Sequence, residues 1–319
     1  RFTATSRCPA SANFLAAESL DSNVTVRRVH VCICTYKRPA MLKRLLEGVG
    51  RQRNDGSFSV AIVVADNDPA ESARDVVTQF AAGSAIPVNY RTQPEKNIAM
   101  TRNCSVASAD GDFIAFLDDD EFPVDDWLLQ LLQSCDRYSS AGILGPVRPH
   151  FDVPPPHWVI RGRFCERPEP ATGSVMEGSK CRTGNVLFRR EIIAGEQAPF
   201  DPKFHNGGED VDFFVRMNRK GHTFHWCNEA VAYESVPPDR SNRRYMLRRA
   251  LLRGKNSLKV SGGRVALVLK SLIAVPLYGI VLPFTLLAGQ HVFMKVCIRF
   301  CDHFGRLTAL VGLNPVSER

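Results

Sequence analysis

The chain has 319 residues, of which 44% are hydrophobic and 23% are charged. This length supports one large domain, or one domain with an appendage, and the composition excludes a disordered chain. The formal net charge of +8 is compatible with a nucleic acid, an anionic membrane surface or a phosphorylated ligand as a partner. No basic stretch interleaved with aromatic residues resembles a nucleic-acid reader, so we expect no nucleic-acid partner.

The ten cysteines include no CxxC pair and no zinc-ligand spacing. Cys32 and Cys34 alternate with apolar residues, which is typical of thiols in a buried strand. This usage favours reduced structural thiols over a disulfide framework. Residues 1–28 contain no continuous apolar segment of the length that a secretory signal requires, so we expect a loose N-terminal leader there.

The first half of the chain alternates between strand and helix patterns. The expected elements, in chain order, are a strand at 29–34, a helix at 41–49, a strand at 60–65, a helix at 71–80, a short extended segment at 88–90, a helix at 100–107, a strand at 113–117 and a helix at 126–135. Such alternation with short connections predicts an α/β fold, with a mainly parallel sheet that helices cover on both faces.

Prolines interrupt the regular patterns between residues 146 and 179. We expect a long loop over the sheet there, with a disordered insertion as the alternative. Periodic structure resumes at 184–189 and in a helix at 210–219.

The last third contains an apolar segment. Between Ser271 and Ala288 no residue is charged, which barely reaches the length of a transmembrane helix. Pro276, Gly279 and Pro283 interrupt this segment and argue against a single straight span.

Basic and amphipathic sequence flanks the apolar segment. Arginines and lysines crowd residues 240–263, which we interpret as a basic amphipathic linker helix. Downstream, Lys295, Arg299 and His303 recur at four-residue spacing, as in an interfacial helix. Residues 264–319 therefore predict a membrane-embedded hairpin or interfacial anchor, with a buried helical pair of a soluble protein as the alternative. An anionic membrane surface is the expected partner, because each basic residue near such a surface contributes about 1 kcal/mol of favourable binding free energy.

The apolar run at 113–117 ends in four consecutive acids, Asp118, Asp119, Asp120 and Glu121. If the run is a strand, the acids lie at its carboxyl end, where open α/β sheets have their ligand crevices. Acids this close repel one another unless a cation or water neutralises them. Mg²⁺ commonly uses one or two carboxylates together with substrate phosphates. The cluster therefore predicts metal-assisted chemistry on a phosphorylated substrate.

Polar residues also follow the two preceding strands. Thr35, Tyr36 and Arg38 come after the strand at 29–34, and Asp66 comes after the strand at 60–65. Each alone is more typical of a helix cap than of a ligand contact. Because all of these strand ends point to one crevice, together they indicate a binding site.

A second acidic motif opens the helix at 210–219. Gly207 and Gly208 precede Glu209 and Asp210. Helix capping would explain one carboxylate at a helix N-terminus. It explains poorly why two consecutive acids follow two glycines. Across a cleft from a metal-bound diphosphate, such a carboxylate is suited to act as a general base on a hydroxyl group.

Together these motifs resemble the family 2 glycosyltransferases. The resemblance rests on residues 34–39, Asp66, and the stretches 97–103, 116–121 and 208–213, and it covers roughly residues 29–235. The whole chain resembles bacterial exopolysaccharide glycosyltransferases of the succinoglycan type, including their arginine-rich helix and apolar tail. The implied catalytic domain, at 29–239, has the GT-A fold, a Rossmann-like nucleotide-diphospho-sugar transferase fold with a mixed, mainly parallel sheet.

The resemblance implies an inverting hexosyltransferase that moves a sugar from a UDP-sugar to a hydroxyl group of a lipid-linked oligosaccharide. It further implies Mg²⁺ or Mn²⁺ as cofactor and the cytoplasmic face of the bacterial inner membrane as location. Asp210 would be the general base, and Glu209 would position Asp210 or the acceptor. The implied nucleotide contacts are Thr35, Tyr36, Arg38, Asp66, Arg102, Asp118 and Asp119, and the implied metal ligands are Asp118, Asp120 and Glu234.

The chain departs from the family at one point. Many relatives carry a histidine metal ligand after the second acidic motif, where this chain has Glu234. Glu234 either substitutes for it or pairs with the arginines that follow. His222 and His225 lack a third ligand and are expected to be structural. The stretch 183–185 predicts either part of the acceptor pocket or a plain turn.

Two other function classes are open. A sugar nucleotidyltransferase is expected to carry a glycine-rich loop after the first strand. Residues 35–39 contain no glycine, which argues against this class. A nucleotide-sugar-binding membrane scaffold without turnover is expected to have lost the acidic residues of the active site. Both acidic motifs are intact, which argues against this class. Binding without turnover would nevertheless look the same in sequence.

Overall fold

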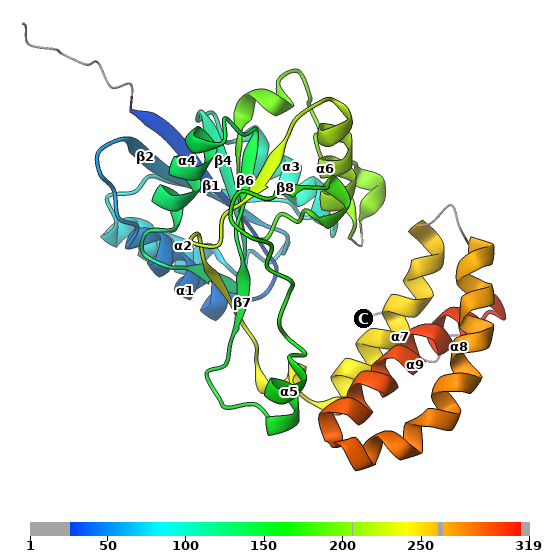
Figure 1. The fold of residues 1–319 in the computed structure, drawn as a ribbon. Helices are drawn as coiled ribbons and strands as arrows, with labels where there is room; N and C mark the ends of the chain where they lie inside the picture. The colour runs from blue at the N-terminus through cyan, green and yellow to red at the C-terminus, as the bar shows by residue number, and fades with distance from the viewer. Residues whose placement is uncertain (1–25, 206, 261–263, 314–319) are drawn as a thin grey trace, which may run out of the picture.

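The computed structural model describes residues 26–205, 207–260 and 264–313. Its centre is an eight-stranded sheet in the order β3-β2-β1-β4-β9-β6-β10-β8 (Figure 1). The strands are β1 (Arg27–Thr35), β2 (Phe58–Asp66), β3 (Val88–Thr92), β4 (Phe113–Asp118), β6 (Gly142–Leu144), β8 (Val175–Met176), β9 (Val186–Arg189) and β10 (Phe224–Trp226). The strands β1 to β4 are parallel, whereas β9 is antiparallel to β4 and β6. The predicted mixed, mainly parallel sheet is confirmed.

Helices cover both faces of this sheet because side chains alternate along each strand. In β1, Val31 and Ile33 pack into one core cluster and Cys32 packs into the other. The first cluster includes side chains of α1 (Pro39–Gly50), α2 (Arg74–Gly83) and α4 (Trp127–Arg137). The second includes side chains of α3 (Ile98–Ala107) and α6 (Glu209–Arg219). With both faces buried, a ligand crevice is expected at the carboxyl ends of the strands.

A second, three-stranded sheet lies beside the acid cluster. Its order is β5-β11-β7, with β5 (Glu121–Pro123), β11 (Ala232–Ser235) and β7 (Val147–His150). The antiparallel pairing of β11 with β5 places Glu234 opposite Glu121. The chain after the second acidic motif thus returns to the first one.

The expectation of a long irregular loop at 146–179 is partly wrong. This segment contains β7, α5 (His157–Gly162), β8 and a short 3-10 helix, Gly178–Lys180. Pro149 is accommodated because β7 is an edge strand, where a missing backbone donor is tolerated. Pro156 directly precedes α5, so it does not interrupt the helix.

The remaining helices form a separate group at the C-terminal side (Figure 1). They are α7 (Arg243–Val260), α8 (Arg264–Thr285) and α9 (Gln290–Leu310), with α7 and α8 both packed against α9. A small apolar cluster joins them to α5, with Trp158 and Val159 against Met246 and Met294. The predicted leader falls mostly outside the described residues, as do the last six residues of the predicted apolar region.

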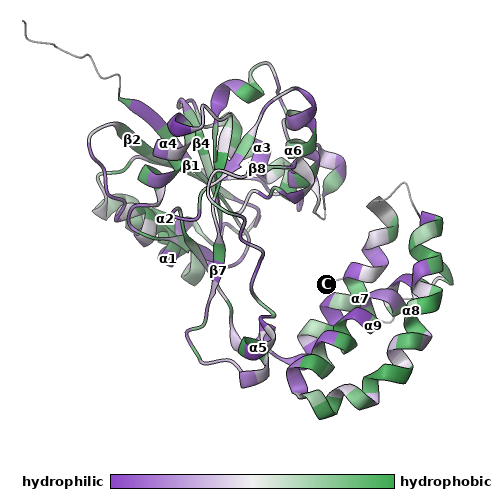
Figure 2. Ribbon diagram, in the orientation of Figure 1, coloured by the Kyte–Doolittle hydropathy of each residue, from purple (hydrophilic) through white to green (hydrophobic). Residues whose placement is uncertain are grey.

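Helix α8 presents a continuous apolar surface (Figure 2). Ile273, Ile280 and Phe284 are 71%, 69% and 67% exposed. Among the described residues, one helix, Arg264–Ala288, is long and apolar enough to cross a membrane by length and composition. Helix α8 continues through Pro276 and Pro283, so these prolines do not end it, and the expectation against a single straight span stays a prediction.

Candidate active site

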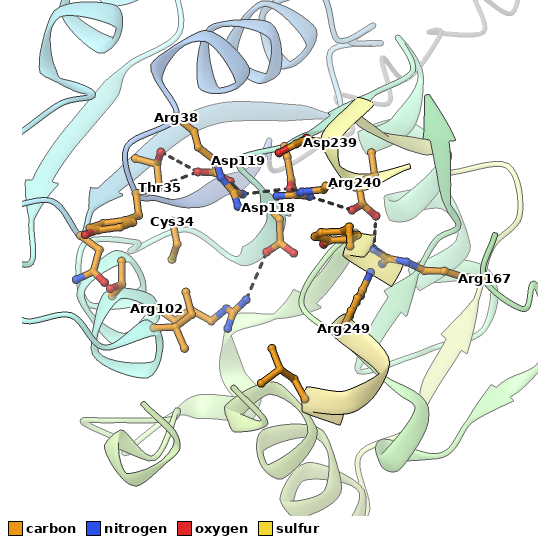
Figure 3. A pocket seen from close by; sticks show the side chains of 18 of the residues that line it. Cys34, Thr35, Arg38, Arg102, Asp118, Asp119, Arg167, Asp239, Arg240 and Arg249 are labelled. Carbon is orange, nitrogen blue, oxygen red and sulfur yellow. Dashed lines mark hydrogen bonds and ion pairs between the residues drawn. The ribbon is translucent and has the colours of Figure 1, made fainter. Parts of the chain in front are cut away.

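A cavity of about 810 Å³ lies at the carboxyl ends of the central strands (Figure 3). Thr35 ends β1, Asn67 follows β2 and Asp118 ends β4, and all three line the cavity. Another part of the wall comes from Arg167, between α5 and β8, and from α7. The predicted convergence of strand ends on one crevice is therefore present in the fold.

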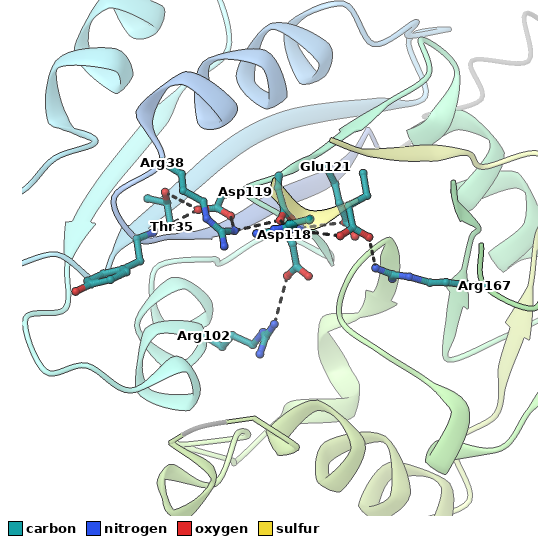
Figure 4. A network of polar contacts seen from close by, with 11 residues as sticks. Thr35, Arg38, Arg102, Asp118, Asp119, Glu121 and Arg167 are labelled. Atoms are coloured by element: carbon teal, nitrogen blue, oxygen red, sulfur yellow. Dashed lines mark hydrogen bonds and ion pairs between the residues drawn. The ribbon is translucent and has the colours of Figure 1, made fainter. Parts of the chain in front are cut away.

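Asp119 holds the end of β1 to the end of β4 (Figure 4). Its Oδ2 accepts hydrogen bonds from Thr35 Oγ1 at 3.0 Å and from the Tyr36 backbone N at 3.3 Å. Its Oδ1 accepts one from Arg38 Nη1 at 2.8 Å. Burial raises the pKa of Asp119 to about 6, and Arg38 opposes this rise. Asp119 thus positions Thr35, Tyr36 and Arg38 around the cavity.

Asp120 and Asp118 contact guanidinium groups from three parts of the chain. Asp120 Oδ2 lies 3.1 Å from Arg38 Nη1 and 2.9 Å from Arg240 Nη1. Asp118 Oδ1 accepts from Arg102 Nη2 at 3.4 Å, and its side chain is 47% exposed. Desolvation by the surrounding protein raises the pKa of Asp118, with Arg102 opposing and Asp120 adding repulsion. A carboxylate that opens on the cavity and lacks sufficient positive charge is suited to bind a cation.

Glu121 lies buried beneath these acids. Its Oε2 accepts a hydrogen bond from the Asp118 backbone N at 3.1 Å, whereas Oε1 has no hydrogen-bond partner among the described residues. Burial, together with the charge of Asp118, raises the pKa of Glu121 well above its ordinary value. A Cβ atom at Gly184 would lie 2.7 Å from Glu121 Oε1 and 3.3 Å from Asp118 Oδ2. The backbone at Gly184 approaches the acids closely because no side chain intervenes.

Arg102 joins the two acidic motifs. Its Nη1 forms a buried ion pair with Glu209 Oε1, and its Nη2 contacts Asp118. Glu209 begins α6, and Gly207 and Gly208 precede it with φ angles of +110° and +98°. Such left-handed conformations favour glycine, so these residues allow the sharp entry into the helix. The fold thereby brings Glu209 next to Asp118, although 91 residues, by subtraction of their numbers, separate them.

Asp210 follows Glu209 at the N-terminus of α6. Its Oδ1 accepts from the Val211 backbone N at 2.8 Å, and its Oδ2 lies 3.9 Å from Arg182 Nε. Asp210 is not one of the cavity-lining residues, but its charge contributes to the raised pKa of Asp118. It therefore lies close to the acid cluster, at the edge of the site.

Asp66 lies behind the cavity wall. Its Oδ1 accepts from the Asp68 backbone N at 2.9 Å, and its Oδ2 accepts from Ala73 N and Tyr90 Oη at 2.9 and 2.8 Å. It is fully buried, so it does not face the cavity in this structure. Asn67, the next residue, lines the cavity instead. The predicted contact of Asp66 with the nucleoside stays a prediction, and its observed role is to hold the loop after β2.

Glu234 is held by two arginines. It accepts from Arg167 Nη2 at 2.5 Å and lies 3.6 Å from Arg240 Nη1. Of the two roles predicted for Glu234, the ion-pair role is thus the one that its contacts display. His225 stacks on Tyr138 and contacts Ser140 Oγ at 2.8 Å, outside the cavity, in keeping with a structural role.

The stretch 183–185 packs under the site and is not among the cavity-lining residues. Asn185 is buried, donates to the Pro146 and Ala230 carbonyl oxygens, and accepts from Trp127 Nε1 at 2.6 Å. This network connects β9 to the core and to β11. The turn thus supports the acid cluster from below.

Several cavity residues escaped prediction from sequence. Arg167 comes from the proline-rich segment, where no pattern marks it. Arg240, Arg248 and Arg249 belong to the basic stretch that was assigned to a membrane surface. The density of arginines was the available signal, but only the fold shows that part of this stretch faces the acids.

The donor set fits a divalent cation bound jointly with a substrate. Across residues 26–313, apart from the undescribed 206 and 261–263, no group of three or more His, Cys, Asp or Glu side chains is arranged to hold a metal ion. Two carboxylates plus substrate phosphates are nevertheless a usual Mg²⁺ environment. Asp118 and Asp120 both line the cavity and provide such a pair.

The sheet order and the acids at the end of β4 define a GT-A-fold transferase. The family model described as Glycosyl transferase family 2 matches residues 30–193, and the chain belongs to this family. The predicted family, fold and transferase class are therefore confirmed.

Named relatives support the same assignment. The succinoglycan biosynthesis protein ExoM of Rhizobium meliloti (strain 1021) is 30% identical over 91% of this chain and 95% of its own length. The hyaluronan synthase of Pasteurella multocida is 25% identical over 66% of this chain, but over only 25% of its own length.

Solved structures share the fold. S. aureus TarS 1-349 in complex with UDP and with UDP-GlcNAc aligns with TM-scores of 0.52 and 0.53, at 12% and 11% identity. Each alignment covers 91% of this chain and 93% of the TarS chain. At this identity the likeness establishes the fold alone. The chain is thus a glycosyltransferase whose relatives include exopolysaccharide synthesis proteins.

Proposed function

We propose that this glycosyltransferase moves a hexose from a UDP-sugar to a hydroxyl group of a lipid-linked oligosaccharide, with inversion at the anomeric carbon and with Mg²⁺ or Mn²⁺. The observation that carries this proposal is the Arg102 bridge, which holds Asp118 and Glu209 together at one cavity. On one side of such a site, Asp118 would bind the leaving diphosphate through the cation. On the other side, the acids at the start of α6 would face the acceptor.

Asp210 is the proposed general base. Its carboxylate accepts the proton of the acceptor hydroxyl while the oxygen attacks the anomeric carbon from the face opposite the diphosphate. One base is sufficient, because the nucleotide leaves as an anion and needs no proton. Glu209 is the positioning residue, since its pairing with Arg102 fixes the start of α6 and so the place of Asp210.

The donor is proposed to lie between Thr35, Asn67 and the end of β4. Tyr36 and Arg38 are held there by Asp119 for contacts with the nucleotide. Asp118 and Asp120 would hold the cation, which supplies positive charge to the departing diphosphate. UDP is the proposed nucleotide because the structurally similar TarS has been solved with UDP and with UDP-GlcNAc.

The cytoplasmic face of the bacterial inner membrane is the proposed location, with the chain peripheral or monotopic. The exposed apolar surface of α8 and the role of ExoM in succinoglycan biosynthesis support it. In this proposal residues 29–239 form the catalytic domain, 240–263 the basic linker, and 264–319 the region that contacts an anionic membrane surface.

The experiment that tests this function is a screen of UDP-sugars for cation-dependent UDP release, with and without a lipid-linked acceptor fraction. The Asp210→Asn variant is expected to lower the acceptor-dependent rate about 10²- to 10⁴-fold. Asp212→Asn is the matched control, because it removes the same charge from the same helix turn, where the carboxylate pairs with Arg216 at 2.8 Å. Equal rates for wild type and Asp210→Asn would exclude Asp210 as the base.

A further inference from the structure

One short segment, residues 178–184, lies against both α6 and the acid cluster. At its start, a Cβ atom on Gly178 would lie 2.6 Å from the backbone carbonyl carbon and oxygen of Phe214, so the segment presses directly on α6. At its end, a Cβ atom on Gly184 would lie 3.3 Å from Asp118 Oδ2. The two glycines therefore allow the backbone of this segment to approach the helix of the second acidic motif and the acids of the first.

Arg182 projects from the middle of this segment. Its neighbours Cys181 and Thr183 are 0% and 1% exposed, whereas its own side chain is 50% exposed. Side chains alternate in this way along extended backbone, and Cys181 has an extended conformation, with φ of −78° and ψ of 150°. Cys181 belongs to the same core cluster as Phe213 and Phe214 of α6. The buried neighbours therefore fix the backbone of Arg182 relative to α6.

The guanidinium group of Arg182 is held by its own segment and faces Asp210. Its Nη1 donates to the carbonyl oxygens of Ser179 at 3.0 Å and Cys181 at 2.6 Å. Its Nε then lies 3.9 Å from Asp210 Oδ2. At this distance the two charges attract each other, but the separation is too long for a hydrogen bond. Arg182 can therefore orient Oδ2 without occupying the lone pairs that a proton acceptor needs.

The two oxygens of the Asp210 carboxylate have different surroundings. Oδ1 accepts a hydrogen bond from the Val211 backbone N at 2.8 Å, which ties it to the first turn of α6, whereas Oδ2 faces Arg182. The carboxylate also interacts with the acid cluster, since its charge contributes to the raised pKa of Asp118. Like charges repel, so a cation beside Asp210 is needed to keep its carboxylate near the cluster.

We propose that Arg182 is a positioning residue for the general base, and that its charge holds the Asp210 carboxylate near the acid cluster with Oδ2 available to the acceptor hydroxyl. This inference rests on the proposed function, in which Asp210 is the base. Arg182 acts through Asp210 and contacts neither the sugar nor the nucleotide.

The test is a double-mutant cycle on acceptor-dependent UDP release by the full chain in detergent micelles, with the UDP-sugar and the acceptor fraction that support turnover. Arg182→Gln is expected to lower kcat about tenfold, because the base is less often directed at the hydroxyl, while the KM values for donor and acceptor change less than about twofold. In Arg182→Gln/Asp210→Asn, kcat is expected to equal that of Asp210→Asn within about twofold, since no base is left to position.

Two further variants are the controls. Arg182→Lys keeps a positive charge but cannot reach the carbonyl oxygens and Asp210 at once, so it is expected to recover part of the lost kcat, about threefold. Lys180→Gln removes a positive charge from the same segment, where the ammonium group pairs with Glu177 at 3.0 Å. Because this exposed pair lies apart from Asp210, kcat is expected to stay within about twofold of wild type.

Three results would overturn the inference. One is a kcat for Arg182→Gln equal to that of wild type, and another is a further loss in the double variant, because Arg182 would then act independently of Asp210. The third is a raised KM for the acceptor at constant kcat, which assigns Arg182 to acceptor binding.

Asp210→Asn alone reports separately on the proposed function. If this variant leaves the rate unchanged, the assigned base is wrong and the inference fails with it. If it lowers the rate and Arg182→Gln does not, the proposed function stands and only this inference fails.

Discussion

Arg102 connects the two acidic motifs, and its replacement gives a sharp prediction. The side chains of Arg102 and Glu209 are only 8% and 3% exposed. In Arg102→Met, Glu209 would keep its charge in a buried place without its cation, and its Oε2 already has no hydrogen-bond partner in the part of the chain that the structure describes. Removing one member of a buried ion pair commonly costs about 3–5 kcal/mol.

We therefore expect Arg102→Met to lower the free energy of unfolding by about 3–5 kcal/mol. The double variant Arg102→Met/Glu209→Gln removes the stranded charge and is expected to recover at least about 1 kcal/mol of this loss. The assay is urea denaturation of the full chain in detergent micelles, followed by tryptophan fluorescence, because Trp127 is fully buried in the core.

The matched control is Arg148→Met, which breaks an exposed pair with Glu169. This change is expected to cost about 0–1 kcal/mol, because solvent screens exposed ion pairs. A loss below about 1 kcal/mol in Arg102→Met, or no recovery in the double variant, would refute the reasoning that Arg102 compensates a buried charge.

Three further changes probe the acid cluster. Gly184→Ala places a Cβ atom within 2.7 Å of Glu121 Oε1 and is expected to destabilise the fold by about 1–3 kcal/mol in urea denaturation. Gly83→Ala is not expected to do so, because among the described residues no atom beyond its own helix backbone and chain neighbours would lie within 4 Å of the new Cβ. The pKa of Asp119 is raised to about 6 in the fold, so the folded state favours the protonated carboxyl group. The contribution of this group to the free energy of unfolding is therefore complete below its ordinary pKa of 3.8 and is lost as the pH rises through 6. Melting without cation should therefore show Asp119→Asn gaining stability relative to wild type between pH 4 and about 7, and a constant difference would contradict this. Asp120→Asn is expected to weaken Mn²⁺ binding in calorimetry by about tenfold or more, while Asp239→Asn, in the same cavity, changes it less.

The sequence contained enough information for the central sheet. Long apolar runs such as the one at 113–117 specify buried strands, and the acids that follow them mark the ligand edge. The strands of two to four residues, including β6, β7 and β11, are too short to give a periodic signal. Pro149 even argued against β7, because a proline in a strand is tolerated only at an edge that the sequence does not reveal.

The site was only partly predictable for the same reason. Asp118 and Glu209 carry local signals, but their connection through Arg102 exists only in three dimensions. Arg167 and Arg240 reach the acids through the pairing of β11 with β5 and β7, which no local pattern shows. Asp66 matched a motif, yet three donors from its own neighbourhood bind its carboxylate, so motif position did not determine the direction in which it points.

The most direct test of the central claim is the anomeric configuration of the product. Once the screen has identified a UDP-sugar and an acceptor fraction, the new glycosidic linkage can be read from its anomeric proton coupling by NMR. A single displacement at this site, with Asp210 as the base, predicts a β-linked product from an α-linked donor. An α-linked product would contradict the account, because it requires retention and therefore a different use of the two acidic motifs.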